Sequence, residues 1–198
     1  VLEKVRVGET GELQTLTITN VGEKPMLIDV LSLVGGDVEE FLIEEEGCGT
    51  RLLEPQASCE VRVRFTPLGL GVRHTTAELH AQMPESPARL EVRGEGLAPI
   101  LTVDPASAVF GSQDVGSDSE PLDLVVGNRG TAPLKISRVT LTGVAEQDFR
   151  LTGNECSKST LTPGQTCGLR LVFVPRAAGE RQAEVVLSSD ALEPETNA

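Results

Sequence analysis

Apolar and polar residues alternate with a period of two over several short stretches of this chain. Residues 58–66 show the alternation most clearly, and residues 15–20 and 75–81 repeat it. The apolar parity of 58–66 consists of Cys59, Val61, Val63 and Phe65. Such alternation is typical of strands with one buried and one solvent-facing side. Residues 38–46 are the nearest helix candidate, but the flanking glycines leave about two turns, so we expect a short strand or turn there.

The pattern repeats itself after 108 residues without a gap. Because Gly, Pro and Asn turn signals separate short strands throughout, each copy predicts a β-sandwich. The repeated positions include Gly8 and Gly116, Asn20 and Asn128, Pro25 and Pro133, Phe41 and Phe149, Cys48 and Cys156, Cys59 and Cys167, Phe65 and Phe173, and Gly71 and Gly179. We therefore expect two domains of one type, at residues 1–98 and 99–198.

Charge and composition exclude some classes of ligand. The formal net charge is −13, and both halves share it: residues 1–98 hold 17 acids and 9 bases, and the remainder holds 13 acids and 8 bases. This charge repels phosphate backbones, so nucleic acid is not an expected partner. The chain has no Trp or Tyr on which bases or sugars could stack. No apolar stretch reaches the roughly 18 to 20 residues of a membrane helix, so membrane insertion is not expected.

The four cysteines form two equally spaced pairs, Cys48 with Cys59 and Cys156 with Cys167. Zinc ligands would be expected at C-x₂₋₄-C spacing, which ten intervening residues do not match. We favour a disulfide within each copy, and free core thiols or a metal site remain the alternatives. Persistent disulfides indicate an oxidising, extracytoplasmic compartment: secreted, cell-surface or periplasmic.

The remaining candidate side chains have structural interpretations. His74 and His80 alternate with core positions and are expected on the surface, roughly 20 Å apart along one strand. The acidic run at residues 44–46 lacks the spacing of a calcium loop and is interpreted as a solvated loop. Asn20 and Asn128, with their glycines, are interpreted as turn residues that supply left-handed backbone geometry. No constellation of Ser, His and acid indicates catalysis, and we expect no metal and no cofactor.

The ordered motifs of each copy resemble those of the ASH or Hydin-like family, called "choice-of-anchor D" in bacteria. The second copy carries them as Asn128-Arg129-Gly130, Asp148-Phe149, Cys156, Leu161-Thr162-Pro163-Gly164, Thr166-Cys167, Phe173-Val174-Pro175 and Gly179. The resemblance implies a seven-stranded, immunoglobulin-like sandwich, related in fold to major sperm protein and to PapD-type chaperones. The predicted fold class is thus all-β, with two tandem immunoglobulin-like β-sandwich domains.

For function, the resemblance implies a protein-interaction, adhesion or spacer module of a larger secreted or surface protein, without enzymatic activity and with a protein partner. A cytosolic ciliary or cytoskeletal scaffold is one alternative, and an accessory domain of a secreted enzyme is another. The state of the cysteines distinguishes the cytosolic alternative from the first.

The second copy is expected to lack its last strand. Residues 90–94 should close a sheet of the first copy, whereas the second copy stops before the corresponding segment. We expect an open edge and a partly open apolar groove beside Phe173 and Leu187. Such an edge predicts strand exchange or edge-mediated self-association, or a less stable second domain.

Overall fold

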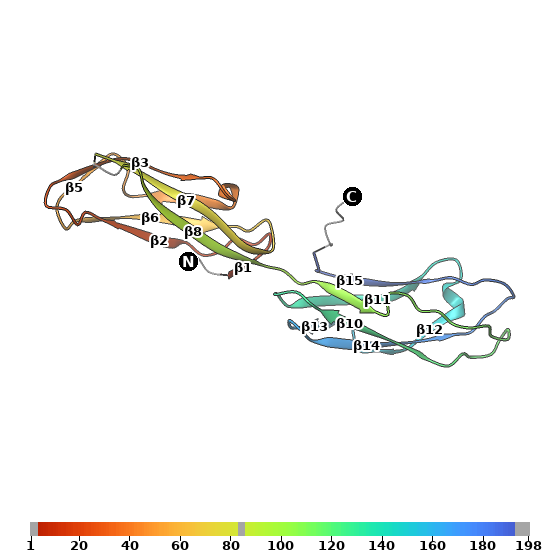
Figure 1. The fold of residues 1–198 in the computed structure, drawn as a ribbon. Helices are drawn as coiled ribbons and strands as arrows, with labels where there is room; N and C mark the ends of the chain where they lie inside the picture. The colour runs from red at the N-terminus through yellow and green to blue at the C-terminus, as the bar shows by residue number, and fades with distance from the viewer. Residues whose placement is uncertain (1–3, 83–85, 193–198) are drawn as a thin grey trace. The chain divides into compact units, whose positions relative to one another are not determined.

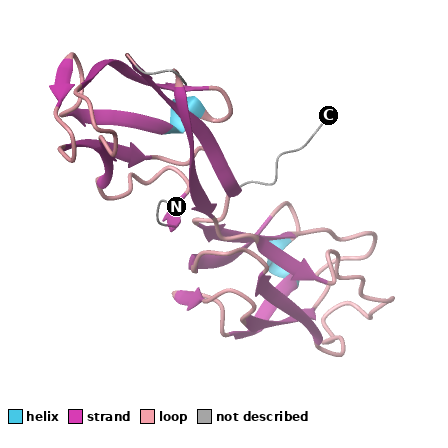
Figure 2. Ribbon diagram, turned by 60° about the vertical axis from the view of Figure 1, so that its left-hand side comes forward, coloured by secondary structure: helices cyan, strands magenta, loops and turns pink. Residues whose placement is uncertain are grey.

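The computed structural model describes residues 4–82 and 86–192 and divides the chain into two compact units, Val1–Leu97 and Ala98–Ala198. Strands dominate both units, and each contains one short 3-10 turn (Figure 1 and Figure 2). These turns are η1 (Val38–Glu40) and η2 (Glu146–Asp148). Each turn is followed directly by a strand, so residues 38–46 contain both of the expected alternatives.

The first unit is a sandwich of two sheets. Its strands are β1 (Lys4–Arg6), β2 (Gln14–Thr19), β3 (Met26–Val34), β4 (Phe41–Glu46), β5 (Arg51–Leu53), β6 (Ser58–Phe65), β7 (Gly71–Ala81) and β8 (Ala88–Leu97). One sheet has the order β1-β8-β7-β3-β5 and the other has the order β2-β6-β4. The residues that alternate inward from β6, Val61, Val63 and Phe65, are at most 1% exposed, because they fill the space between the sheets.

The second unit has the same plan. Its strands are β9 (Leu101–Asp104), β10 (Leu122–Asn128), β11 (Leu134–Thr142), β12 (Phe149–Asn154), β13 (Ser159–Leu161), β14 (Thr166–Phe173) and β15 (Glu184–Ser189). The sheets have the orders β12-β14-β10-β9 and β13-β11-β15. The prediction of tandem all-β, immunoglobulin-like sandwiches is therefore confirmed.

The offset of 108 holds for strand pairing as well as for residue identity. Leu16 pairs with Val61 between β2 and β6, and Leu124 pairs with Leu169 between β10 and β14. Irregularities recur at matching places too: β3 shifts register after Ile28 and β11 shifts after Ile136. The same pattern of apolar positions thus directs the same ladder twice.

Among the described residues, the units differ at three strand positions. The first is β1, since the corresponding residues 112–114 of the second unit form no strand. As expected, residues 90–94 close a sheet of the first unit, within β8, which pairs with β7 from Gly71↔Gly96 to Leu79↔Ala88. No strand takes the equivalent place in the described part of the second unit, where β15 ends its sheet. Conversely, β9 pairs with β10 in the second unit, whereas β2, the counterpart of β10, is an edge strand among the described residues of the first.

Candidate functional site

Each unit contains one disulfide at the same place. Cys48 is bonded to Cys59 and Cys156 to Cys167, with Cα atoms 5.3 Å apart in both pairs. Each disulfide joins the loop before β5 or β13 to the second residue of the central strand, β6 or β14. The four cysteines are at most 9% exposed, so the bridges belong to the two cores.

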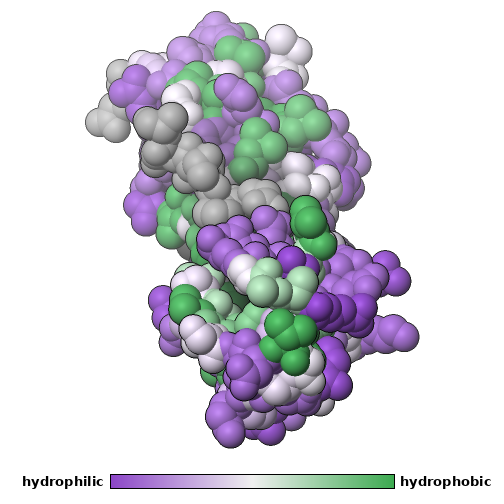
Figure 3. Space-filling view, turned by 90° about the vertical axis from the view of Figure 1, so that its right-hand side faces the viewer, coloured by the Kyte–Doolittle hydropathy of each residue, from purple (hydrophilic) through white to green (hydrophobic). Residues whose placement is uncertain are grey.

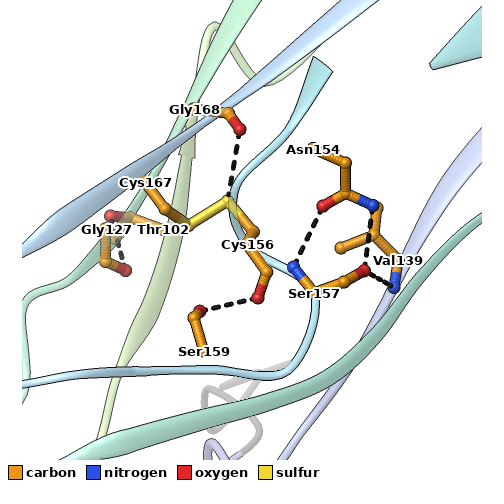
Figure 4. Close-up of a disulfide and its surroundings, with 9 residues drawn as sticks. All are labelled: Thr102, Gly127, Val139, Asn154, Cys156, Ser157, Ser159, Cys167 and Gly168. Carbon is orange, nitrogen blue, oxygen red and sulfur yellow. Dashed lines mark hydrogen bonds between the residues drawn. A yellow bond between two sulfur atoms is a disulfide. The ribbon is translucent and has the colours of Figure 1, made fainter. Parts of the chain in front are cut away.

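Around the second disulfide, polar groups fix the loop that carries Cys156 (Figure 4). The Sγ atom of Cys156 lies 3.7 Å from the carbonyl oxygen of Gly168. Asn154 accepts a bond from the backbone N–H of Ser157 through Oδ1, at 3.0 Å. The hydroxyl of Ser157 in turn accepts one from the N–H of Val139, at 3.1 Å, which connects the loop to β11. The polar groups around this disulfide thus hold the loop in place and support a structural role for the bridge.

A buried asparagine anchors a loop in each unit. The Nδ2 group of Asn128 donates to the carbonyls of Ala132 and Leu161, at 2.8 and 2.9 Å. Its Oδ1 atom accepts from the N–H groups of Gly130 and Ile100, at 2.9 and 3.3 Å. Asn128 is only 1% exposed. Its side chain thus joins segments that lie up to 33 residues apart in sequence.

Asn20 makes the equivalent bonds in the first unit, donating to Lys24 and Leu53 and accepting from Gly22. The prediction that these asparagines and their glycines supply left-handed geometry is wrong, because neither the asparagines nor Gly22 and Gly130 have a positive φ. The side chain matters because it satisfies buried backbone groups that strand pairing leaves without partners.

A buried acid and an arginine form a second shared contact, which the sequence analysis did not identify. Glu40 is 4% exposed, and its carboxylate accepts bonds from Arg73 at 2.7 to 3.0 Å. Asp148 and Arg181 form the same pair in the second unit. The hydrogen bond to Glu40 raises the pKa of Arg73 above its ordinary value. In the first unit the pair fastens the 3-10 turn to the start of β7, and in the second it fastens the turn to the segment just before β15.

The two histidines lie on the surface, as predicted, with side chains 54% and 43% exposed for His74 and His80. The interpretation of residues 44–46 as a loop is wrong, because they form the end of β4 and pair with β6. Glu44 forms a two-pronged ion pair with Arg64 of β6. Hydrogen bonding to Arg64 lowers the pKa of Glu44. Within residues 4–82 and 86–192, no three His, Cys, Asp or Glu side chains form a group that could hold a metal ion.

The surface of the described residues offers shallow, polar features. One open depression in the first unit is lined by side chains of β4 and β6, among them Glu45, Glu60 and Arg62. Another in the second unit lies beside the ion pair of Asp148 and Arg181. On the face drawn in Figure 3, hydrophilic side chains predominate and hydrophobic ones form small separate patches. No helix in the described ranges has the length and hydropathy of a membrane span.

An exposed ion pair on the outer face of the second unit joins β10 to β14. Arg170 donates to both carboxylate oxygens of Asp123, at 2.7 and 3.0 Å. This contact lowers the pKa of Asp123 and raises that of Arg170. Because both side chains are more than half exposed, solvent screens the pair and its contribution to stability is small.

Comparisons with known proteins identify structures of low similarity. No family model matches the chain, and no curated protein matches its sequence. The secreted serine protease VesC from Vibrio cholerae aligns over 94% of this chain and 48% of its own, with 15% identity and a TM-score of 0.41; the chain thus spans about half of that protein. A protein of unknown function from Porphyromonas gingivalis W83 aligns over 94% of this chain and 87% of its own, with 13% identity and a TM-score of 0.34. The class 5 fimbriae chaperone CfaA aligns over 97% of this chain and 91% of its own, with 8% identity and a TM-score of 0.33.

Proposed function

We propose that this chain is a non-enzymatic interaction or spacer module of a larger extracytoplasmic protein, built from two ASH/Hydin-like domains. The observation that carries the proposal is the disulfide that recurs at the same place in both sandwiches. Disulfides of this kind form and persist in secreted, surface and periplasmic proteins and are rare in the cytosol. A cytosolic scaffold would keep the same residues as thiols.

The proposal of an interaction or spacer role draws on what the two copies share. Both retain the disulfide, the buried asparagine and the acid–arginine pair, all of which stabilise the fold. A repeated domain that is stabilised by its own contacts suits a protein that offers binding surfaces to partners or separates other domains by a fixed distance. Recognition would then use sheet faces, loops or strand edges.

The compartment is tested by producing the chain in a reducing cytosol and, with an export signal, in an oxidising periplasm. We expect the exported protein to show no free thiols and to yield only the peptides Cys48–Cys59 and Cys156–Cys167 on non-reducing mapping. We also expect reduction to lower the stability of each unit by about 2 to 3 kcal/mol, the value for a loop of this size. Four free thiols in the exported protein, a bridge between the units, or equal stability after reduction would contradict the proposal.

A further inference from the structure

The first and last described strands of the first unit lie side by side and run in the same direction. β1 pairs with β8 in parallel register, from Lys4↔Glu95 to Arg6↔Leu97 (Figure 1). A backbone bond of 2.8 Å from the N–H of Val7 to the carbonyl of Leu97 continues this pairing. The two strands at the ends of this unit are therefore bonded directly to each other.

The direction of these two strands decides how their contact responds to tension along the chain. A pull on the N-terminal end of the chain acts on Lys4, at the start of β1, and a pull on the C-terminal end acts on Leu97, at the end of β8. Because Ala98 already belongs to the second unit, the pull reaches Leu97 without an intervening linker. Parallel strands that are pulled from opposite ends slide along each other, so their evenly spaced bonds share the load and must break together. Tension therefore loads this contact in shear.

The other partner of β8 responds differently to a pull. β7 is antiparallel to β8, and Gly71 lies opposite Gly96 at one end of their nine residue pairs. A pull between Leu70 and Leu97 therefore opens this ladder from that end, one pair after another. The strand β8 thus meets a pull on the chain ends in shear, and it meets a pull on the turn before β7 by unzipping.

Both strands of the parallel contact are fastened to the core of the unit. Val5 of β1 is 6% exposed, and the segment after β1 is held by a backbone bond of 2.9 Å from Gly11 to Phe65. On β8, a Cβ atom added to Gly94 would lie 2.6 Å from two ring atoms of Phe65, so the strand lies directly on this buried ring. Each strand can therefore carry load without separating from the core beforehand.

Shear and unzipping require different forces. In unzipping, the opening of one residue pair lengthens the loaded chain by two residues, about 6.6 Å at 3.3 Å per residue. In shear, the three pairs of β1 and β8 are lost within a slide of one residue, about 3.3 Å. For equal work per pair, shear thus needs about six times the force. Because forced rupture depends on the unfolding rate and not only on this work, we expect a difference of at least about threefold.

We propose that the first unit bears mechanical tension, with β1 and β8 as a shear clamp that resists extension of the chain. The inference rests on the spacer role in the proposed function, because a spacer keeps its distance under tension only while it stays folded. The disulfide between Cys48 and Cys59 limits the extension that follows failure of the clamp, since the residues between these cysteines stay closed in a loop.

The test is single-molecule force spectroscopy of the whole chain, held either at its two ends or at its C-terminal end and position 70. Leu70 is 44% exposed, and its replacement there is an azide-bearing residue, because an added thiol can exchange with the disulfides. In the second arrangement the 27 residues from Gly71 to Leu97 extend by up to about 90 Å, which identifies the rupture of the first unit. The second unit is loaded identically in both arrangements. We expect the first unit to rupture at a force at least about threefold higher when the chain is held at its ends.

The variant Val7→Pro tests the clamp with the chain held at its ends. Val7 is the second residue of a turn closed by the bond from Glu9 to Arg6, in which Gly8 has a φ of 81°, and proline suits that position of such a turn. The substitution removes the N–H that bonds Leu97. We expect the rupture force to fall by roughly a third, because the bonds of a parallel pair share the load. The control Val7→Ala keeps this N–H and should lower the force by less than about a tenth.

Equal rupture forces in the two arrangements, or equal effects of the two variants of Val7, would overturn the clamp. Far-UV circular dichroism checks that both variants fold. If Val7→Pro does not fold, the comparison of the two arrangements decides, because it leaves every contact of the clamp unchanged. A failed clamp with both disulfides intact would leave the proposed function standing, whereas free thiols after export would overturn that function and leave the mechanical result unaffected.

Discussion

Replacing Asn128 by alanine should destabilise the second unit more than its position at the end of β10 suggests. The substitution removes four hydrogen bonds: two to buried carbonyls and two from backbone N–H groups. The bond from Ile100 is 3.3 Å long and contributes least. The other three are 2.8 to 2.9 Å long, and a typical net contribution is about 1 kcal/mol each.

The loss should exceed the sum of these bonds. The carbonyls of Ala132 and Leu161 lose the donor that reaches them inside the protein, and a buried group without a partner costs about 1 to 3 kcal/mol. We therefore expect Asn128→Ala to lower the free energy of unfolding of the second unit by about 3 to 5 kcal/mol. For a domain of this size, that corresponds to a fall in Tm of more than about 10 °C.

Asn20→Ala is the matched control in the first unit. It removes three equivalent bonds, and the described residues of the first unit contain no counterpart of the fourth bond, which Ile100 donates to Asn128. We expect a slightly smaller loss, confined to the first unit. Asn128→Asp tests the two hydrogen bonds that Nδ2 donates. It keeps the shape of the side chain but places an oxygen atom against the carbonyls of Ala132 and Leu161. That variant should recover stability as the pH falls, because protonating a buried carboxyl removes its charge.

Differential scanning calorimetry and far-UV circular dichroism are suitable assays, since the chain lacks Trp and Tyr and therefore gives little intrinsic fluorescence. A loss of stability in one unit should lower the midpoint of one unfolding transition and leave the other unchanged. A loss below about 1 kcal/mol for Asn128→Ala would refute the reasoning, because it would mean that water or the backbone satisfies these groups equally well.

Three further outcomes follow from the first unit. Replacing both Cys48 and Cys59 by alanine should lower the stability of that unit by about 2 to 3 kcal/mol, measured by urea denaturation, and reductant should then have no further effect on it. Gly94→Ala should cost roughly 1 to 3 kcal/mol because the added methyl overlaps the ring beneath it, and an unchanged Tm would contradict this packing. The hydrogen bond from Arg64 lowers the pKa of Glu44, so the ion pair stabilises the folded state at pH values above 4.5, the ordinary pKa. This stabilisation is lost as the pH falls through the lowered pKa. The original chain should have a slightly higher Tm than the variant Glu44→Gln at pH 7. This difference in Tm should shrink as the pH is lowered to 3, and it should also shrink in high salt.

The architecture could be predicted because it follows from residues that are close together in the sequence. A period of two places alternate residues on one face of a strand whatever its partner is, so β6 and its inward residues are visible in sequence. The repeat then doubles the information, since Cys48 and Cys59 recur at identical spacing. The prediction that residues 90–94 pair along a sheet of the first copy is confirmed by β8.

The anchors could not be predicted because their partners are distant in sequence. The donors of Asn128 reach a carbonyl 33 residues away, and Glu40 and Arg73 are also 33 residues apart. A propensity for turns explains an Asn-x-Gly sequence equally well, and that explanation led to the wrong backbone geometry. The available signal was the repeat itself, which pairs an acid with an arginine at the same separation in Asp148 and Arg181.

Comparison of the two copies distinguishes positions that maintain the fold from positions that can differ between binding surfaces. What recurs, such as the disulfide and the buried asparagine, is buried and satisfied within its own unit, so it has no capacity left for a ligand. The differences lie at the surface: the acidic residues 44–46 of the first unit correspond to Thr152, Gly153 and Asn154 in the second. A partner that binds one unit and not the other is therefore expected to distinguish them by this charge, and exchanging Glu44 with Thr152 should shift its binding while leaving both folds intact.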